Sequence, residues 1–142
     1  MKIHIVTVGQ PKLAYAKAGW DEYYARLQRF HDMRVTRIAD HHNDAEHILA
    51  ALGSSYVVAL EIQGKEYSSE SLANFLEQRT LESREVCFVI GGPDGLPQEV
   101  SAKAHTKLSF GPMTLPHDLA MVVLLEQLFR ASSINAGLPY HR

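Results

Sequence analysis

An apolar run that ends in a cluster of glycines constrains the fold of this chain more than any other feature. Residues 86–90, Val-Cys-Phe-Val-Ile, are followed directly by Gly-Gly-Pro-Asp-Gly-Leu at 91–96. The run predicts a buried strand, and three glycines in five residues free the backbone for positive φ angles and leave it bare of side chains. Such a turn suits a ligand that rests on main-chain groups. It equally suits a tight connection between a strand and a helix.

Strand and helix patterns alternate along the whole chain. Strands are expected at residues 2–8, 33–39, 56–62, 86–90 and 108–110, and helices at about 13–30, 43–52, from Ser68 or Ser69 onward, 98–104 and after Pro116. Strands separated by helices indicate parallel βαβ units, so we predict an α/β fold with a parallel sheet. The 142 residues, 46% of them hydrophobic, suffice for one core, and a single domain covering residues 1–142 is expected.

Three of the expected strands end in segments suited to a ligand. Leu60 and Glu61 close the third strand, Gly91–Gly95 follow the fourth, and Phe110–Leu115 follow the fifth. Because ligands of parallel sheets bind at the carboxyl ends of the strands, we predict that these loops converge on one cleft. The chain lacks the glycine fingerprint of dinucleotide folds after its first strand, and it lacks a Gly-Lys-Ser/Thr phosphate loop. A nucleoside triphosphate is therefore not expected in the cleft.

The charge balance restricts the ways in which the protein could hold a nucleic acid. Fourteen basic and sixteen acidic residues leave a net charge of −2, which argues against binding mainly by counterion release. Residues 1–40 carry seven Lys or Arg against four Asp or Glu, so any contact with a polyanion would begin there. The same basic residues are also typical of a solvated helix and strand edge.

Other features bear on compartment and metal binding. The single cysteine, Cys87, excludes an internal disulfide and is expected to be a core residue. The longest apolar stretch, Leu119–Leu125, is too short to span a bilayer, and the N-terminus alternates like a strand instead of resembling a signal peptide, so a cytoplasmic protein is expected. His41, His42 and His47 do not have the spacing of a standard ligand set, so no metal is expected.

Four segments in series resemble a single protein family, and the similarity runs essentially end to end. They are Phe88–Leu96, Leu108–His117, Val122–Arg130 and Pro139–Arg142, and Val8-Gly9 and Leu60–Lys65 resemble the family in the right order and spacing. Together they resemble the bacterial large-subunit rRNA pseudouridine N3-methyltransferases of the SPOUT superfamily. The resemblance implies methylation of N3 of a pseudouridine in 23S rRNA, in the stem-loop at the ribosomal subunit interface.

The resemblance also implies a C-terminal trefoil knot, a homodimer, and S-adenosylmethionine bound in the knotted loops. Carried over by position, the cofactor-binding residues are Leu60, Gly91, Phe110, Gly111, Pro112, Met113, Thr114 and Leu115. These residues lie in the three loops that the strand pattern already placed around one cleft. The adenine would be bound mainly by main-chain groups and apolar walls.

Methyl transfer requires few catalytic groups, because the sulfonium is already activated and only the N3 proton must be removed or shared. The candidate catalytic residues are His117, Glu126, Arg130, Tyr140, His141 and Arg142. The resemblance implies that the last three lie near the cofactor cleft. His141 could accept the proton, the two arginines could hold a phosphate or an imide anion, and Tyr140 could stack on the base.

Each of these candidates also has a purely structural explanation. Glu126 and Arg130 have the spacing of an ion pair on one helix, His117 could simply begin a helix, and a Tyr-His-Arg tail is often frayed. The chain also departs from the family at Met121, where an arginine is usual, and this could weaken a contact with RNA. Two other functions stay open: methylation of tRNA or another rRNA site, and a noncatalytic RNA- or nucleotide-binding domain.

Overall fold

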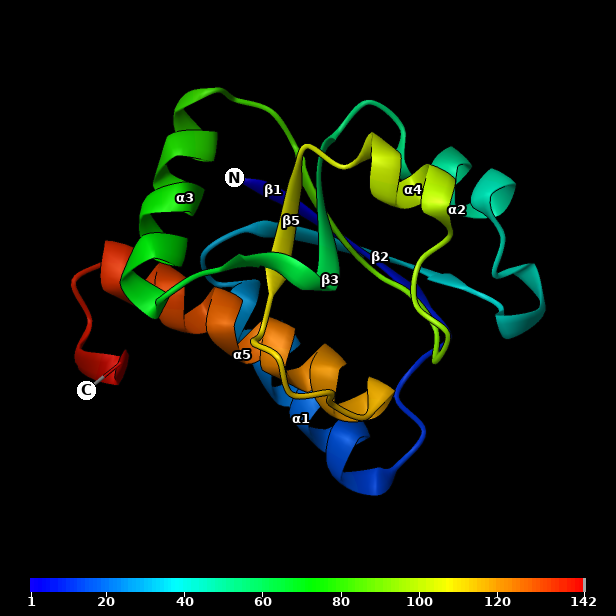
Figure 1. The fold of residues 1–142 in the computed structure, drawn as a ribbon. Helices are drawn as coiled ribbons and strands as arrows, with labels where there is room; N and C mark the ends of the chain where they lie inside the picture. Colours follow the sequence, from blue (N-terminus) through cyan, green and yellow to red (C-terminus); the bar gives the residue numbers. More distant parts are fainter. Residues whose placement is uncertain (142) are drawn as a thin grey trace.

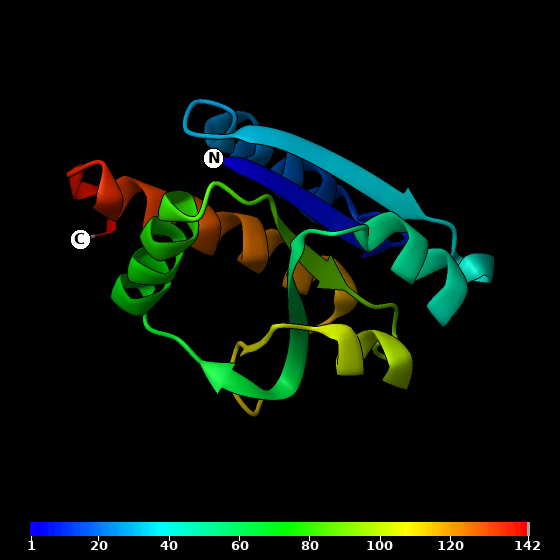
Figure 2. The same cartoon turned by 90° about the horizontal axis from the view of Figure 1, so that it is seen from above.

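The computed structural model describes residues 1–141 and forms three layers, with helices on both faces of one sheet (Figures 1 and 2). The strands are β1 (Lys2–Val8), β2 (Asp32–Ile38), β3 (Tyr56–Glu66), β4 (Val86–Ile90) and β5 (Thr106–Ser109). The helices are α1 (Ala14–Leu27), α2 (Ala45–Leu52), α3 (Ser69–Leu81), α4 (Gln98–Lys103) and α5 (His117–Asn135), with 3-10 turns η1 (Asp40–His42) and η2 (Pro139–His141). Within residues 1–141, no helix is both long and apolar enough to cross a membrane.

The sheet is parallel throughout, with the strand order β2-β1-β4-β3-β5. The predicted α/β fold with a parallel sheet is therefore confirmed. Helices α1, α3 and α5 pack together on one face, while α2 and α4 lie side by side away from them (Figure 1). In the view from above, α3 lies at one end of the molecule and α2 and α4 lie at the other (Figure 2).

Strand β3 is longer than the apolar pattern predicts, because it continues through the polar residues Gln63–Glu66. Its pairing with β5 shifts register there, so that Leu60 and Lys65 both pair with Leu108. Gly64 makes this close approach possible, since a Cβ atom at that position would lie 2.6 Å from the carbonyl oxygen of Lys107. The extension depends on a neighbouring strand distant in sequence, and the local pattern carries no sign of it.

Alternating residues of the strands divide the core between the two faces of the sheet. On β4, Phe88 faces the cluster formed by α1, α3 and α5, whereas Cys87 and Val89 face α2 and α4. Cys87 is completely buried, and this burial raises the pKa of its thiol to about 12, as expected for a core cysteine. Met121 is also completely buried in the α5 layer, so this position points into the core and away from any surface that could contact RNA.

His31 should make the stability of the protein sensitive to acid. Its Nε2 donates to Ser132 Oγ at 2.7 Å, because that hydroxyl donates its own proton to the Leu128 carbonyl. Burial, aided by the N-terminal ammonium, lowers the pKa of His31 from 6.5 to about 4. The unfolded chain therefore binds the proton first, so stability is complete above about pH 6.5 and declines by roughly 2–3 kcal/mol as the pH falls towards 4.

Urea unfolding of the wild type and His31→Gln between pH 7.5 and 4.5 measures this contribution. The glutamine can still donate a hydrogen bond but cannot titrate, so the variant should lose less stability over this pH range than the wild type. Buried His4, whose pKa is also lowered by burial, is present in both proteins and cancels in the comparison. Equal losses in the two proteins would contradict the assignment to His31.

Candidate functional site

A cavity of about 410 Å³ opens at the carboxyl ends of β4 and β5, beside Leu60–Ile62 of β3. The structure brings together there the three segments that the strand pattern predicted to converge, although the first of them lies within β3, and the start of α5 closes one side. The lining residues are Leu60–Ile62, Ile90–Gly95, Leu108, Phe110, Gly111, Met113–Leu115, His117 and Ala120. This volume is within the range of pockets that hold small organic ligands.

The glycine loop is folded tightly upon itself. The Gly95 N–H donates to the Gly92 carbonyl at 2.9 Å, and Gly95 has a positive φ of 82°. A Cβ atom at Gly91 would lie 2.6 Å from the carbonyl carbon of Gly95, closer than real contacts allow. The two alternatives for this loop, a ligand-binding loop and a tight connection between a strand and a helix, are therefore compatible. The same glycines that make the turn also leave main-chain groups bare at the cavity.

The loop after β5 is held against the end of β3. Ser109 Oγ donates to the Ile62 carbonyl at 2.7 Å and accepts from the Gly111 N–H at 3.0 Å. Gly111 has a φ of 110°, a conformation in which residues other than glycine are strained. Ser109 was not among the predicted site residues. The only local signal for it is a small polar residue just before Phe-Gly-Pro.

Glu61 is a second residue that the site prediction left out. Its carboxylate lines the cavity, and both of its oxygens lie 2.9 Å from the hydroxyl of Ser101 on α4. The sequence placed Glu61 at the close of the expected strand 56–62, whereas in the structure it lies within β3, and no local pattern indicates its partner on α4. The hydrogen bond holds one acidic group at the cavity wall with further lone pairs free to accept.

The first two residues of α5 join this helix to the connection between β1 and α1. His117 lines the cavity and lies with Nε2 2.8 Å from the Val8 carbonyl. Asp118 Oδ2 accepts the backbone N–H groups of Lys12 at 2.8 Å and Leu13 at 2.7 Å. Leu13 occupies the N-cap position of α1 and cannot cap it, so a carboxylate from another helix supplies the acceptor.

Removing this acceptor should destabilise the protein. We expect Asp118→Ala to lower the free energy of unfolding by about 1–2 kcal/mol, because two N–H groups at the start of α1 lose their partner. Urea unfolding measures the loss. Asp21→Ala is a matched control on the exposed side of α1, with an expected change of about 0.5 kcal/mol or less. A loss no greater than that of the control would show that Asp118 does not act as a cap.

Glu126, Arg130 and Tyr140 form one compact cluster. Arg130 donates to Glu126 through Nη2 at 2.6 Å and through Nε at 3.2 Å, and the Tyr140 hydroxyl donates to the same carboxylate at 2.8 Å. The Tyr140 ring packs edge-on against Phe129, with the centroids 4.7 Å apart. Burial and the hydrogen bonds to Tyr23 and Glu126 raise the pKa of Tyr140. The tail is therefore anchored on α5 at Tyr140 and not frayed there.

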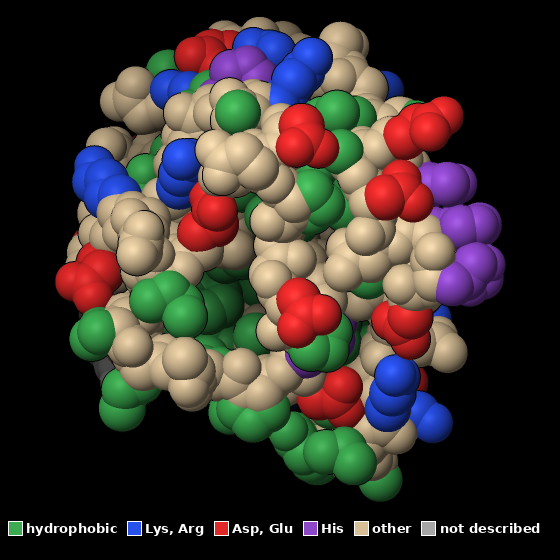
Figure 3. Space-filling view, turned by 45° about the vertical axis from the view of Figure 1, so that its right-hand side comes forward, with side chains coloured by type: hydrophobic (Ala, Val, Ile, Leu, Met, Phe, Trp, Pro, Cys, Tyr) green, Lys and Arg blue, Asp and Glu red, His purple; other side chains and the backbone are tan. Residues whose placement is uncertain are grey.

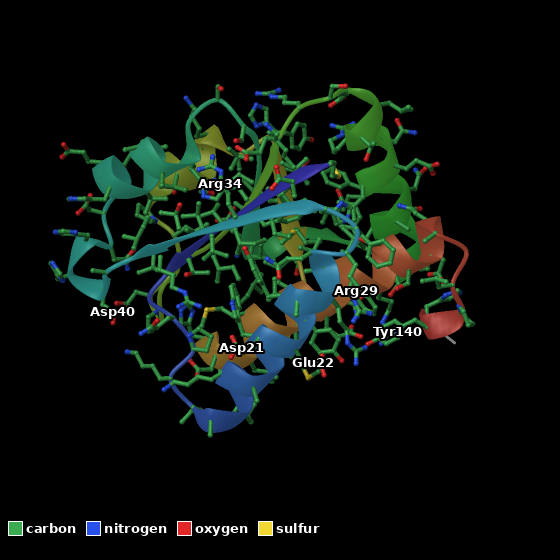
Figure 4. All side chains as sticks on the ribbon, turned by 180° about the vertical axis from the view of Figure 1, so that it is seen from behind. Asp21, Glu22, Arg29, Arg34, Asp40 and Tyr140 are labelled. Atoms are coloured by element: carbon green, nitrogen blue, oxygen red, sulfur yellow. The ribbon has the colours of Figure 1, made fainter. Side chains whose placement is uncertain are left out.

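This cluster lies on the middle and the C-terminal half of α5, whereas the cavity lies at the start of the helix. His117 and Arg130 are separated by thirteen helical residues, or about 20 Å at 1.5 Å per residue. Figure 4 shows Tyr140 and Asp40 at opposite ends of the molecule, and Asp40 adjoins Gly9 on the cavity side. Within one chain, Tyr140 and His141 therefore lie away from the cavity. The expectation that the tail lies near a cofactor cleft came from the resemblance and stays a prediction.

The predicted site residues thus separate into two groups. The structure brings Leu60, Gly91, Phe110, Gly111, Met113, Thr114, Leu115 and His117 together around the cavity. Pro112 belongs to the same loop but does not line the cavity, while Glu126, Arg130, Tyr140 and His141 lie on or beside the far end of α5. Arg142 lies outside the described residues.

A surface cluster is formed by His41 and His42 of η1 together with His47 of α2. The ring centroids of His41 and His42 lie 4.1 Å apart, and those of His42 and His47 lie 4.0 Å apart with nearly parallel planes. Figure 3 shows histidine side chains gathered at one edge of the molecule. In the part of the chain that the structure describes, no group of His, Cys, Asp or Glu is arranged to hold a metal ion.

The chain folds as an α/β protein with a parallel sheet, and its apolar cavity lies behind a glycine loop at the carboxyl edge of that sheet. Proteins of this class typically bind a small organic ligand at this edge. Comparison with known proteins narrows this class, because the family model described as "Predicted SPOUT methyltransferase" matches residues 1–141. The chain belongs to the SPOUT methyltransferase family.

Two relatives match the chain over its whole length. The ribosomal RNA large subunit methyltransferase H of Deinococcus radiodurans is 48% identical and covers 100% of this chain and 99% of its own length. The protein of the same name from Streptococcus uberis is 39% identical, with complete coverage of both chains. The resemblance inferred from the four sequence segments is therefore confirmed.

Solved structures with low sequence identity share the fold. A probable methylase family protein from Haemophilus influenzae has a TM-score of 0.60 at 14% identity, with 95% of this chain and 68% of that chain covered. The tRNA (m1G37) methyltransferase of Aquifex aeolicus has a TM-score of 0.57 at 12% identity, with 92% of this chain and 69% of that chain covered. These likenesses support the fold assignment, and the family assignment depends on the sequence matches.

Proposed function

We propose that this protein transfers a methyl group from S-adenosylmethionine to N3 of a pseudouridine in 23S rRNA, in the stem-loop at the ribosomal subunit interface. One observation carries the proposal. The chain matches proteins called ribosomal RNA large subunit methyltransferase H over its full length at up to 48% identity. The cavity at the carboxyl edge of the sheet supplies a site for the methyl donor.

The residues around the cavity fit this cofactor. Apolar side chains such as Leu60, Ile90 and Leu108 suit the adenine, and the bare glycine loop offers main-chain groups to the ribose and base. Among the described lining residues two are acidic, Glu61 and Asp94, and none is Lys or Arg, which suits a ligand with a sulfonium and an ammonium. When bound, the cofactor supplies a methyl group on positively charged sulfur that is ready for direct displacement.

The segment from Phe110 to Leu115 would cover the cofactor. Met113 is 79% exposed at the rim, and Ser109 anchors the start of this segment to β3. The trefoil knot that the resemblance implies would include this segment. A covering segment held in this way would limit the access of water to the sulfonium.

We further propose a homodimer in which the C-terminal tail of one subunit completes the cofactor cleft of the other. The support is the placement of the tail, which is anchored through Tyr140 on Glu126, nine residues along α5 from His117 at the cavity, given that the tail carries candidate catalytic residues. Tyr140, Glu126 and Arg130 then serve to anchor the tail, since their polar groups already bind one another. His141 and Arg142 are left to approach the RNA bound at the partner's cleft.

Large-subunit rRNA is the proposed partner, and the cytoplasm, where ribosomes lie, is the proposed compartment. The net charge of −2 fits a small footprint on folded RNA that is recognised by shape and a few splayed bases. The basic side chains of the N-terminal third could contact its phosphates. Lys12 is among them and is paired with Asp40 at 3.3 Å, close to the cavity.

Transfer of labelled methyl groups to ribosomes from a strain that lacks this activity tests the proposal. Wild-type ribosomes are unsuitable because their target should already be modified. Nuclease digestion and mass spectrometry should locate the label as N3-methylpseudouridine in 23S rRNA. Label in tRNA or at another rRNA position would favour a different substrate. Cofactor binding without transfer to any RNA would favour a binding protein, and loss of both would refute the methyltransferase assignment.

A further inference from the structure

The hydrogen bond of His117 determines which of its ring nitrogens carries the proton. Nε2 lies 2.8 Å from the Val8 carbonyl oxygen, and a carbonyl can only accept. Nε2 must therefore be the protonated nitrogen. In the neutral imidazole the lone pair then belongs to Nδ1, the nitrogen that can accept a proton.

This nitrogen belongs to a side chain that lines the proposed cofactor cavity. Among residues 1–141, Nδ1 of His117 has no hydrogen-bond partner, and the ring shares the cavity wall with Gly91 and Leu115. The position of the ring is well determined, because Val8 binds Nε2 and Asp118 ties the same turn of α5 to Lys12 and Leu13.

Gly9 leaves room beside this ring. Its φ is 82°, and a Cβ atom there would lie 2.8 Å from Asp40 Oδ1 and 3.9 Å from Nε2 of His117. The backbone of the β1–α1 connection can therefore pass close to the imidazole without a side chain between them. The result is a fixed imidazole at the edge of the cavity, with its basic nitrogen unpaired.

We propose that Nδ1 of His117 accepts the N3 proton of the target base, an inference that depends on the proposed function. As the N3–H bond breaks, its electron pair forms the bond from N3 to the methyl carbon. The bond from that carbon to sulfur breaks, and its electron pair stays on the sulfur of S-adenosylhomocysteine. The imidazolium then releases the proton to water. An imide nitrogen is a poor nucleophile while protonated, so this transfer contributes directly to the rate.

Other groups are less suited to the role. His141, which could also accept the proton, lies away from the cavity of its own chain, so it could reach a cleft only as part of the partner subunit's tail. The carboxylate of Glu61 already accepts the hydroxyl proton of Ser101, and a carboxylate is ordinarily a weaker base than an imidazole. The charged groups that border His117 or share its cavity are Asp40, Lys12, Asp118, Asp94 and Glu61. Lys12 and Asp40 pair with each other, and Asp118 accepts two backbone N–H groups, so these charged groups already have partners.

The variant His117→Gln tests the proposal, because the glutamine amide can still donate to the Val8 carbonyl but has no basic nitrogen at the position of Nδ1. Single-turnover methyl transfer to undermethylated ribosomes should fall about 10²- to 10⁴-fold near neutral pH. Calorimetric affinity for S-adenosylmethionine should stay close to that of the wild type. The rate of the variant should rise more steeply with pH than that of the wild type, because in the variant the imide must ionise without help. The exposed His41→Gln serves as the matched control.

A measurement on the wild type keeps the test valid even if the variant folds poorly. The ¹⁵N chemical shifts of the His117 imidazole should report a proton on Nε2 and none on Nδ1. A proton on Nδ1 would overturn the proposal. The proposal would also be overturned if the wild type produces N3-methylpseudouridine and His117→Gln has the same rate and pH profile as the wild type. If the wild type itself produces no N3-methylpseudouridine, the proposed function is refuted, and this inference, which depends on it, is refuted as well.

Discussion

Gly91→Ala is expected to abolish cofactor binding. The added Cβ atom would lie 2.6 Å from the Gly95 carbonyl carbon, 2.7 Å from its oxygen and 2.8 Å from the Leu96 nitrogen. All three are backbone atoms, so the loop would have to open instead of shifting one flexible side chain. We expect the affinity for S-adenosylmethionine to fall at least about 100-fold and the free energy of unfolding to fall by roughly 2–4 kcal/mol. Isothermal calorimetry and urea unfolding measure the two effects.

Two other glycines separate the effect of crowding from the general effect of replacing glycine. Gly53→Ala meets no atom within 4 Å but has a φ of 57°, so it should cost about 1 kcal/mol of stability and leave binding unchanged. Gly92→Ala would meet the Asn43 side-chain nitrogen at 3.3 Å and should have a smaller effect than Gly91→Ala. Normal cofactor affinity in a folded Gly91→Ala protein would show that the glycine loop does not form the site.

Deletion of residues 140–142 should abolish methyl transfer while cofactor binding persists. Tyr140 anchors the tail through Glu126 and Phe129, which lie nine and twelve residues along α5 from His117 at the cavity. The cavity should therefore keep its shape when the tail is removed. Transfer to undermethylated ribosomes and calorimetric binding of S-adenosylmethionine measure the two properties separately. A deletion protein with normal transfer would remove the tail from the mechanism.

A mixed dimer then shows whether the C-terminal tail acts at the cleft of the partner subunit or at the cleft of its own chain. Co-expression of Gly91→Ala subunits with tail-deleted subunits would yield some dimers in which an intact cleft meets the partner's intact tail. Random pairing of equal amounts should restore about a quarter of the wild-type activity, because half of the dimers are mixed and each has one complete site of two. The preparations of each variant alone should be inactive. If mixing restores nothing although mixed dimers form, the tail does not act across the dimer.

Local sequence patterns predicted most of the architecture. The apolar runs of β1 and β4 and the alternation of strands with helices were sufficient for the parallel sheet, since their signals lie within each segment. Prediction was poorer at the ends of elements. Strand β3 extends through polar residues because β5 pairs with it, and α1 ends at Leu27, three residues earlier than the apolar pattern suggests.

The candidate site was predictable in place but not in detail. Strand ends predicted three convergent loops, because parallel strands end at the same edge of a sheet. The contacts that complete the site join residues far apart in the chain, such as Glu61 with Ser101, Ser109 with Ile62, and Asp118 with Lys12. No local pattern contains these pairs, so the sequence could not have identified them.

The sequence by itself determined the class of fold, the family and the position of the cleft, because strand periodicity, glycine placement and four spaced motifs are properties of short segments. Only the tertiary structure decided that His117 is bound through Nε2 to Val8, and that the tail, anchored by Tyr140, lies remote from its own cavity. The physical reason is that both depend on three-dimensional distance. A hydrogen bond between residues 109 positions apart and the length of a 19-residue helix decide which groups can reach the reacting atoms.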